Sequence, residues 1–133
     1  MAVRPSRNWR DLVAEEAREV AAGTLDSECA YLADSYSESF LSDTDTVLAG
    51  FERDVSVLAA PSGEQVLHIV ERVVLALNEV HHRHKSSGYD TDEREQLCVF
   101  IDDVLTQHGI DVSRLASLHG VSRYEITDRW RRW

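Results

Sequence analysis

The stretch that decides the fold is SGEQVLHIVERVVLALNEVHHR, residues 62–83. Its apolar residues recur at intervals of three and four, which is the repeat of one face of an α-helix. The stripe comprises Val66, Ile69, Val70, Val73, Val74, Leu77 and Val80. Ser62 and Gln65 have the spacing of a capping box, which favours a helix start at this point. The stretch therefore predicts a central core helix near residues 63–84.

Helical patterns also fill the chain on both sides of this stretch. Only 6 Gly and 2 Pro interrupt the 133 residues, and no run of alternating apolar residues bounded by turns predicts a strand. The expected helices cover approximately residues 8–22, 25–40, 42–60, 63–84, 92–109, 112–119 and a last one from 122. The sequence thus predicts an all-α fold, a bundle of about five to seven helices that forms one domain over residues 1–133.

Several details of these helices follow from single residues. Asn8 can cap the first helix, whose apolar side would hold Leu12, Val13, Ala17, Val20 and Ala21. Asp92 can cap the helix that ends near Gly109. Cys29 and Cys98 lie within helical patterns without CxxC spacing, so both are expected to be buried free thiols.

Charge limits the classes of function. The chain has 24 acidic and 14 basic residues, a net charge of −10, which repels nucleic acid and anionic membranes and suits a basic protein partner. The first residues lack an apolar signal core, and no apolar run approaches the roughly 20 residues that cross a bilayer. A cytoplasmic protein without membrane contact is expected.

The C-terminal stretch has the spacing of a helix-turn-helix. Ala116 is the small residue of the first helix, Gly120 the turn residue, and Ile126 a residue of the apolar contact. A DNA-reading function would use Arg123, Tyr124 and Thr127. However, residues 113–133 carry a charge of +3 while the rest of the chain carries −13. This balance favours a helical corner that closes the domain, with Trp130 and Trp133 as anchors and its arginines paired with acids, and leaves DNA binding as the alternative.

Metal and catalytic motifs do not stand out. His81, His82 and His84 lie close together, but no Cys or carboxylate accompanies them at ligand spacing, and histidines suit the C-terminal end of a helix. The sequence holds no phosphate-binding glycine loop, GxSxG or HExxH motif. We expect no metal, no cofactor and no enzymatic activity.

The acidic surface is the better guide to function. Residues 90–111 contain seven acidic residues and one basic residue, Arg94. A surface of this kind would steer a cationic protein toward the chain, with a tyrosine as an aromatic anchor. The expected partner-binding residues are Tyr89, Asp90, Asp92, Glu93, Glu95, Asp102 and Asp103.

Residues 70–109 also carry a resemblance. The apolar helix that ends in Leu77-Asn78, followed by YDTDEREQLC over residues 89–98, resembles the small acidic helical immunity-type proteins of bacterial toxin systems. The resemblance covers roughly 40 of the 133 residues. It implies a protein that binds a basic toxin or effector and blocks it through its acidic residues.

Overall fold

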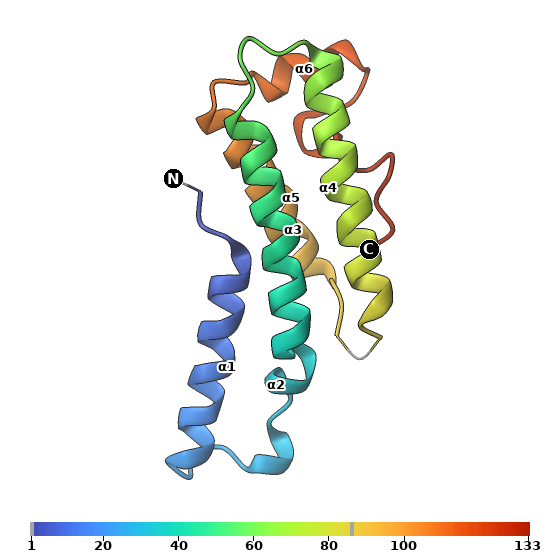
Figure 1. Ribbon diagram of the computed structural model, residues 1–133. Coiled ribbons are helices and arrows are strands. Elements are labelled where there is room, and N and C mark those ends of the chain that lie inside the picture. Colours follow the sequence, from blue (N-terminus) through green and yellow to red (C-terminus); the bar gives the residue numbers. More distant parts are fainter. Residues whose placement is uncertain (1, 86) are drawn as a thin grey trace.

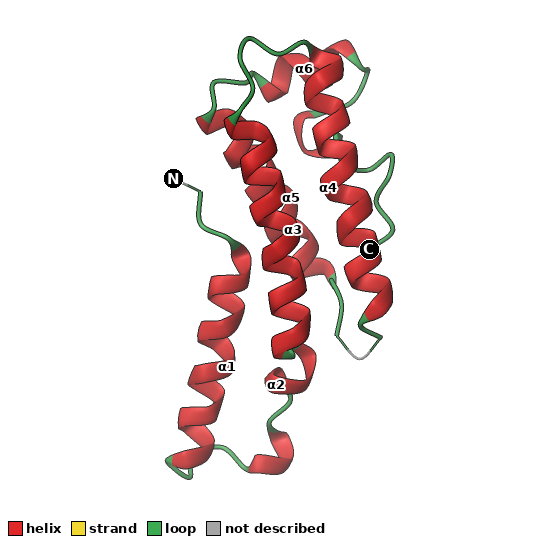
Figure 2. Ribbon diagram, in the orientation of Figure 1, coloured by secondary structure: helices red, strands yellow, loops and turns green. Residues whose placement is uncertain are grey.

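The computed structural model describes residues 2–85 and 87–133, and this part of the chain contains helices and loops without any strand (Figure 2). The predicted all-α class is confirmed. The elements are α1 (Pro5–Ala21), the 3-10 turn η1 (Ser27–Cys29), α2 (Leu32–Ser35), α3 (Glu38–Ser56), α4 (Gly63–Arg83), α5 (Thr91–Gln107), α6 (Val112–Leu118) and the 3-10 turn η2 (Arg123–Glu125). None of the helices in the described residues is long and apolar enough to cross a membrane.

The four long helices form an up-and-down bundle. Figure 1 shows α1, α3, α4 and α5 running in alternating directions, with α6 across the end where α3 finishes and α4 begins. α3 and α4 form the most extensive pair, and α1 packs against both α3 and α5. Short connections between antiparallel neighbours are typical of such bundles.

The central helix follows the sequence pattern closely. Ser62 caps α4: its backbone N–H donates to Gln65 Oε1 at 2.8 Å, and the Gln65 N–H donates to Ser62 Oγ at 3.2 Å. All seven residues of the predicted apolar stripe are buried. The stripe packs against α3 and belongs to one core cluster with buried residues of α5. Burial of one continuous face is what stabilises a helix in a bundle.

An aromatic layer joins distant parts of the chain. Trp9 of α1 stacks on Tyr36 with ring centroids 5.5 Å apart, and Phe40 of α3 lies 5.1 Å from Tyr89. Tyr89 in turn meets Trp133 edge to face at 5.4 Å. We call these five rings the aromatic layer; they hold α1, α3, the loop before α5 and the last residues in one cluster.

α1 differs from the prediction in its start and in its buried face. The helix begins at Pro5, three residues before the start expected from Asn8, because proline fits the first helical position, where no backbone N–H is required. Its buried residues are Pro5, Ser6, Trp9 and Glu16, whereas the predicted apolar side is half-buried or exposed. Leu12, the largest residue of that side, is 41% exposed. The predicted face was wrong because the second half of α1 extends past the core.

The single helix expected over residues 25–40 is absent. Asp26 accepts a hydrogen bond from the Glu28 N–H, and Ser37 accepts one from the Phe40 N–H. Both capping residues have extended backbone, so they divide the segment into η1, α2 and the start of α3. Cys29 lies in this divided segment and is exposed, contrary to the expected burial; Cys98 is half-buried, and both thiols are free.

Two boundaries near the C-terminus also differ. Asp90, rather than Asp92, precedes the first turn of α5. Gly120 adopts the expected positive φ of 70° after α6, but the helix predicted from Ser122 is only the three-residue turn η2 followed by further turns. The corner therefore has its first helix and its turn, and lacks the second helix of a helix-turn-helix.

The last residues are held against α4. The Asn78 side chain donates to the Trp130 carbonyl at 2.8 Å and accepts from the Arg132 N–H at 2.9 Å. Trp133 is buried and Trp130 packs partly against the core, as predicted for the two anchors.

Candidate protein-binding surface

The structure divides the seven predicted partner-binding residues. Asp90, Asp92, Glu95 and Asp103 are exposed on the N-terminal part and outer face of α5. Tyr89, Glu93 and Asp102 are buried. The predicted surface therefore retains four carboxylates and loses its aromatic anchor.

Tyr89 belongs to the core. Its side chain is 3% exposed, and its hydroxyl shares a 2.6 Å hydrogen bond with Thr44 Oγ1. Burial raises the pKa of Tyr89 above its ordinary value. The structure therefore places Tyr89 within the core and not on the surface where an aromatic anchor was expected.

Asp102 fastens the C-terminal corner to α5. Arg123 donates to both of its carboxylate oxygens, Nε to Oδ2 at 2.7 Å and Nη2 to Oδ1 at 2.6 Å. This hydrogen bonding raises the pKa of Arg123. The expected pairing of a tail arginine with an acid of the body is therefore present, and Asp102 is buried beneath Arg123.

The three candidate DNA-reading residues do not form a reading face. Arg123 is engaged by Asp102, Thr127 is buried beside Cys98, and Tyr124 alone projects into solvent. They lie on η2 and the turns after it, where a recognition helix would be required. Glu125 completes a capping box with Ser122, and those hydrogen bonds lower the pKa of Glu125. The turn therefore carries the negative charge of this carboxylate.

The histidines at the C-terminal end of α4 make contacts with neighbouring elements. His81 Nδ1 accepts the Tyr89 N–H at 3.0 Å, and His84 Nε2 lies 2.8 Å from Asp43 Oδ2. Gly88 has a φ of 125°, and a Cβ at this position would lie 2.9 Å from His81 Nδ1. Across residues 2–85 and 87–133, no three His, Cys, Asp or Glu side chains are placed to hold a metal ion.

A larger group of exposed acids lies elsewhere, in a region we call the acidic end, residues 11–38. It contains eight acidic residues and one basic residue, Arg18. Figure 1 shows the second half of α1 and the segment up to α2 projecting beyond the other helices. Seven of the acids are exposed: Asp11, Glu15, Glu19, Asp26, Glu28, Asp34 and Glu38. A charge count along the sequence points to part of this region, since residues 23–60 contain eight acidic residues and one basic residue, Arg53.

The eighth acid, Glu16, holds the acidic end together. Its side chain is buried, and its carboxylate accepts the backbone N–H of Tyr31 at 3.2 Å and of Leu32 at 3.0 Å. These N–H groups stand at the start of α2, where a helix has unpaired donors. The Glu16 side chain thus attaches the backbone of the segment after α1 to α1.

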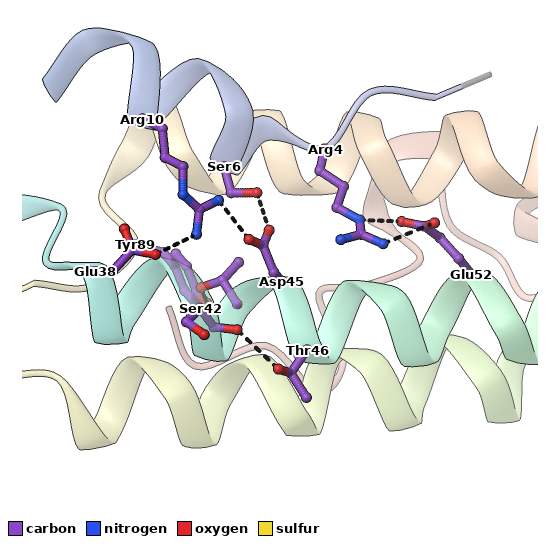
Figure 3. A network of polar contacts seen from close by, with 10 residues as sticks. Arg4, Ser6, Arg10, Glu38, Ser42, Asp45, Thr46, Glu52 and Tyr89 are labelled. Carbon is purple, nitrogen blue, oxygen red and sulfur yellow. Dashed lines mark hydrogen bonds and ion pairs between the residues drawn. The ribbon is translucent and has the colours of Figure 1, made fainter. Parts of the chain in front are cut away.

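Ion pairs attach the first half of α1 to α3 (Figure 3). Arg4 donates to Glu52 at 2.6 Å, and Arg10 donates to Asp45 at 2.6 Å and to Glu38 at 3.1 Å. Ser6 donates a further hydrogen bond to Asp45. These contacts fix the direction in which α1 carries the acidic end away from the bundle.

Two shallow grooves flank the exposed face of α5. One is lined by residues before and at the start of α1, including Val3 and Asn8, and the other by Tyr124, Asp128 and neighbouring residues. Glu95 and Val99 line both grooves. This surface was not predictable from the sequence pattern, because only the fold brings Val3 and Tyr124 beside α5.

No protein-family model matches the chain, and the comparisons with curated proteins and with solved structures found no match.

Proposed function

We propose that this chain is a non-enzymatic protein-binding protein, an inhibitor of the immunity or antitoxin type that captures a basic toxin or effector. The observation that carries the proposal is the acidic end, which holds seven exposed carboxylates and one basic residue, with Glu38 paired to Arg10 just outside it. The basic residue within it, Arg18, is already paired with Glu15. The region therefore presents a strongly negative surface to a partner.

Such a surface acts mainly on the rate of association. Carboxylates that share one side of a molecule attract a cationic protein over about a Debye length, roughly 8 Å at physiological ionic strength. Electrostatic attraction of this kind raises association rates and makes them sensitive to salt. The acidic end suits the task because Glu16 and the Arg10 contacts keep its backbone in place before binding.

The test compares two charge-reversed variants. Asp11→Lys/Glu19→Lys removes two exposed carboxylates that lie eight residues apart on α1. Glu71→Lys/Glu79→Lys makes the same change of charge at the same spacing on α4, outside the acidic end. The tagged wild-type chain is used to capture its partner from native cells, the partner is identified by mass spectrometry, and the association rate of each variant is measured.

We expect a basic partner whose association slows about tenfold with Asp11→Lys/Glu19→Lys at low salt and becomes less dependent on salt. The α4 variant should associate at a rate close to that of the wild type. An acidic or neutral partner, or equal slowing by both variants, would contradict capture by the acidic end.

A further inference from the structure

The three residues 87–89, which we call the 87–89 loop, connect the end of α4 to the acidic end. The Tyr89 N–H donates to His81 Nδ1 on α4 at 3.0 Å, and the two rings stack with centroids 5.8 Å apart. At the other side of the loop, the Ser87 hydroxyl donates to the carbonyl oxygen of Asp34 in α2 at 3.1 Å. A change at His81 can therefore reach α2 through this loop.

The contact with the loop requires a neutral His81 ring. A backbone N–H can only donate, so His81 Nδ1 must carry a lone pair and the ring proton must lie on Nε2. The backbone also approaches the ring closely, since a Cβ at Gly88 would lie 2.9 Å from His81 Nδ1. A partly buried donor that loses its acceptor is destabilising, so this hydrogen bond matters to the position of the loop.

We infer that His81 is an acid-sensitive latch for the 87–89 loop. Histidine is the side chain that ordinarily gains a proton between about pH 8 and 5. A second ring proton taken from solvent would set a His81 N–H donor against the Tyr89 N–H donor, so the hydrogen bond is lost and the loop is released. Release of Ser87 removes a contact from Asp34 and loosens α2. The latch acts in the free chain, so it does not depend on which partner the acidic end captures.

His84, one turn further on, responds to acid in the opposite sense. Its Nε2 lies 2.8 Å from Asp43 Oδ2 of α3, and Arg83 Nη2 lies 3.7 Å from the same oxygen. A protonated His84 therefore forms an ion pair with Asp43. Acid thus holds the end of α4 on α3 while it releases the 87–89 loop, which keeps the change local.

Other charged groups surround the latch but keep their charge over this interval. They are Asp43 and Asp45 of α3, Arg83 of α4, Lys85 and Asp90 on either side of the loop, and Arg131 beside the Trp133 ring. Carboxylates ordinarily titrate below about pH 5, and lysine and arginine above about pH 10. The histidines are therefore the groups near the loop whose charge changes between these limits.

NMR of the labelled free protein tests the latch. Ring nitrogen shifts give the tautomer and protonation of His81 from about pH 8 to 5. Amide exchange at Tyr89 and Tyr36, expressed as protection relative to an unfolded chain at the same pH, reports release of the loop and of α2. His81→Asn keeps an acceptor, because its Oδ1 takes the place of Nδ1, but it cannot gain a proton. His82→Asn is the matched control, since His82 is an exposed histidine of the same turn.

We expect His81 to carry its proton on Nε2 at about pH 8, and the protection of the Tyr89 amide to fall about tenfold by about pH 5. The Tyr36 N–H, which closes α2 on Leu32, should lose protection to a smaller extent. Amides of the buried α4 stripe should keep their protection. His82→Asn should show the same fall at Tyr89, and His81→Asn should remove it.

Several results would overturn the latch. These are a proton on His81 Nδ1 at about pH 8, equal protection of the Tyr89 amide at both limits, and the same fall in His81→Asn as in the wild type. Loss of protection throughout the chain would overturn it as well, because acid would then unfold the bundle. An unaffected Tyr36 amide would overturn the link to α2. If His81→Asn does not fold, the ring and amide signals of the wild type still decide.

Discussion

Three carboxylates of similar appearance in the sequence have different environments in the structure. Glu16 is buried and accepts two backbone N–H groups, Asp102 is buried and binds Arg123, and Glu95 faces solvent beside Val99. Burial of a charge is tolerated only where hydrogen bonds replace the lost water. The first two residues therefore contribute to stability, and the third remains free to contact a partner.

Asp102→Asn should destabilise the fold. The asparagine amide can accept only part of the two hydrogen bonds that Arg123 donates, and its NH₂ group would face the guanidinium. We expect a loss of about 1–3 kcal/mol in the free energy of unfolding, measured by urea denaturation.

Asp128→Asn is the control, because it also removes one carboxylate that is paired with an arginine. Asp128 is exposed and its pair with Arg131 spans one turn, so a change within about 0.5 kcal/mol is expected. Equal losses in the free energy of unfolding for the two variants would show that the burial of Asp102 does not increase its contribution to stability.

α1 is a helix with two different halves. Its first half is fixed by Trp9 in the aromatic layer and by ion pairs to α3, whereas its second half and the segment up to α2 contain no residue of the main core cluster. Regions with few buried apolar contacts open locally at low cost in free energy. The acidic end therefore depends on Glu16 more than on packing.

Glu16→Ala should loosen the acidic end without affecting the bundle. Amide hydrogen exchange at Tyr31 and Leu32, which lose their acceptor, should accelerate strongly, while exchange at the buried stripe of α4 should stay unchanged. Glu15→Ala on the exposed side of the same turn serves as the control and should leave both regions as they are. Uniform acceleration throughout the chain would instead mean that Glu16 supports the whole fold.

Periodicity predicted the elements whose buried face is continuous. The predicted helices over residues 63–84 and 92–109 agree with α4 and α5 because each helix presents one apolar stripe to the core. The capping box at Ser62 determined the start of α4. The pattern over residues 25–40 failed because Asp26 and Ser37 cap short segments and override the apolar repeat. A local hydrogen bond of this kind competes with the helix and leaves no trace in periodicity.

The candidate surface was less predictable than the fold. The sequence identified acids around α5, but it could not separate Glu95 from Glu93, since burial depends on which side of α5 meets the aromatic layer. Likewise, the sequence predicted that the tail arginines pair with acids, with DNA contact by Arg123 as the alternative, but it could not name Asp102, 21 positions away, as the partner. Pairings over such separations are set by packing, which a single sequence does not display.

At the scale of the whole molecule, the aromatic layer links stability to alkaline pH. Burial and the nearby Glu93 carboxylate raise the pKa of Tyr36 to about 12, from an ordinary value of 10.0. The unfolded chain therefore releases this proton at lower pH than the folded chain. The resulting contribution to stability is fully present below pH 10 and is lost as the pH rises toward about 12.

We predict that the free energy of unfolding falls over this interval and that Tyr36→Phe makes the fall shallower. The fall should not vanish, because burial raises the pKa of Tyr89 in the same direction. Urea denaturation at several alkaline pH values measures the slope. An identical slope for Tyr36→Phe and the wild type would show that Tyr36 does not contribute.

The aromatic layer also provides a built-in optical probe. Two of the three tryptophans, Trp9 and Trp133, are buried in it, and the Trp9 indole donates to Gln96 Oε1 at 2.8 Å. Their fluorescence reports whether α1 and the last residues stay docked on the bundle. A partner that binds only the outer surfaces should leave the emission spectrum unchanged, whereas one that pulls α1 away should shift it toward the red without any added label.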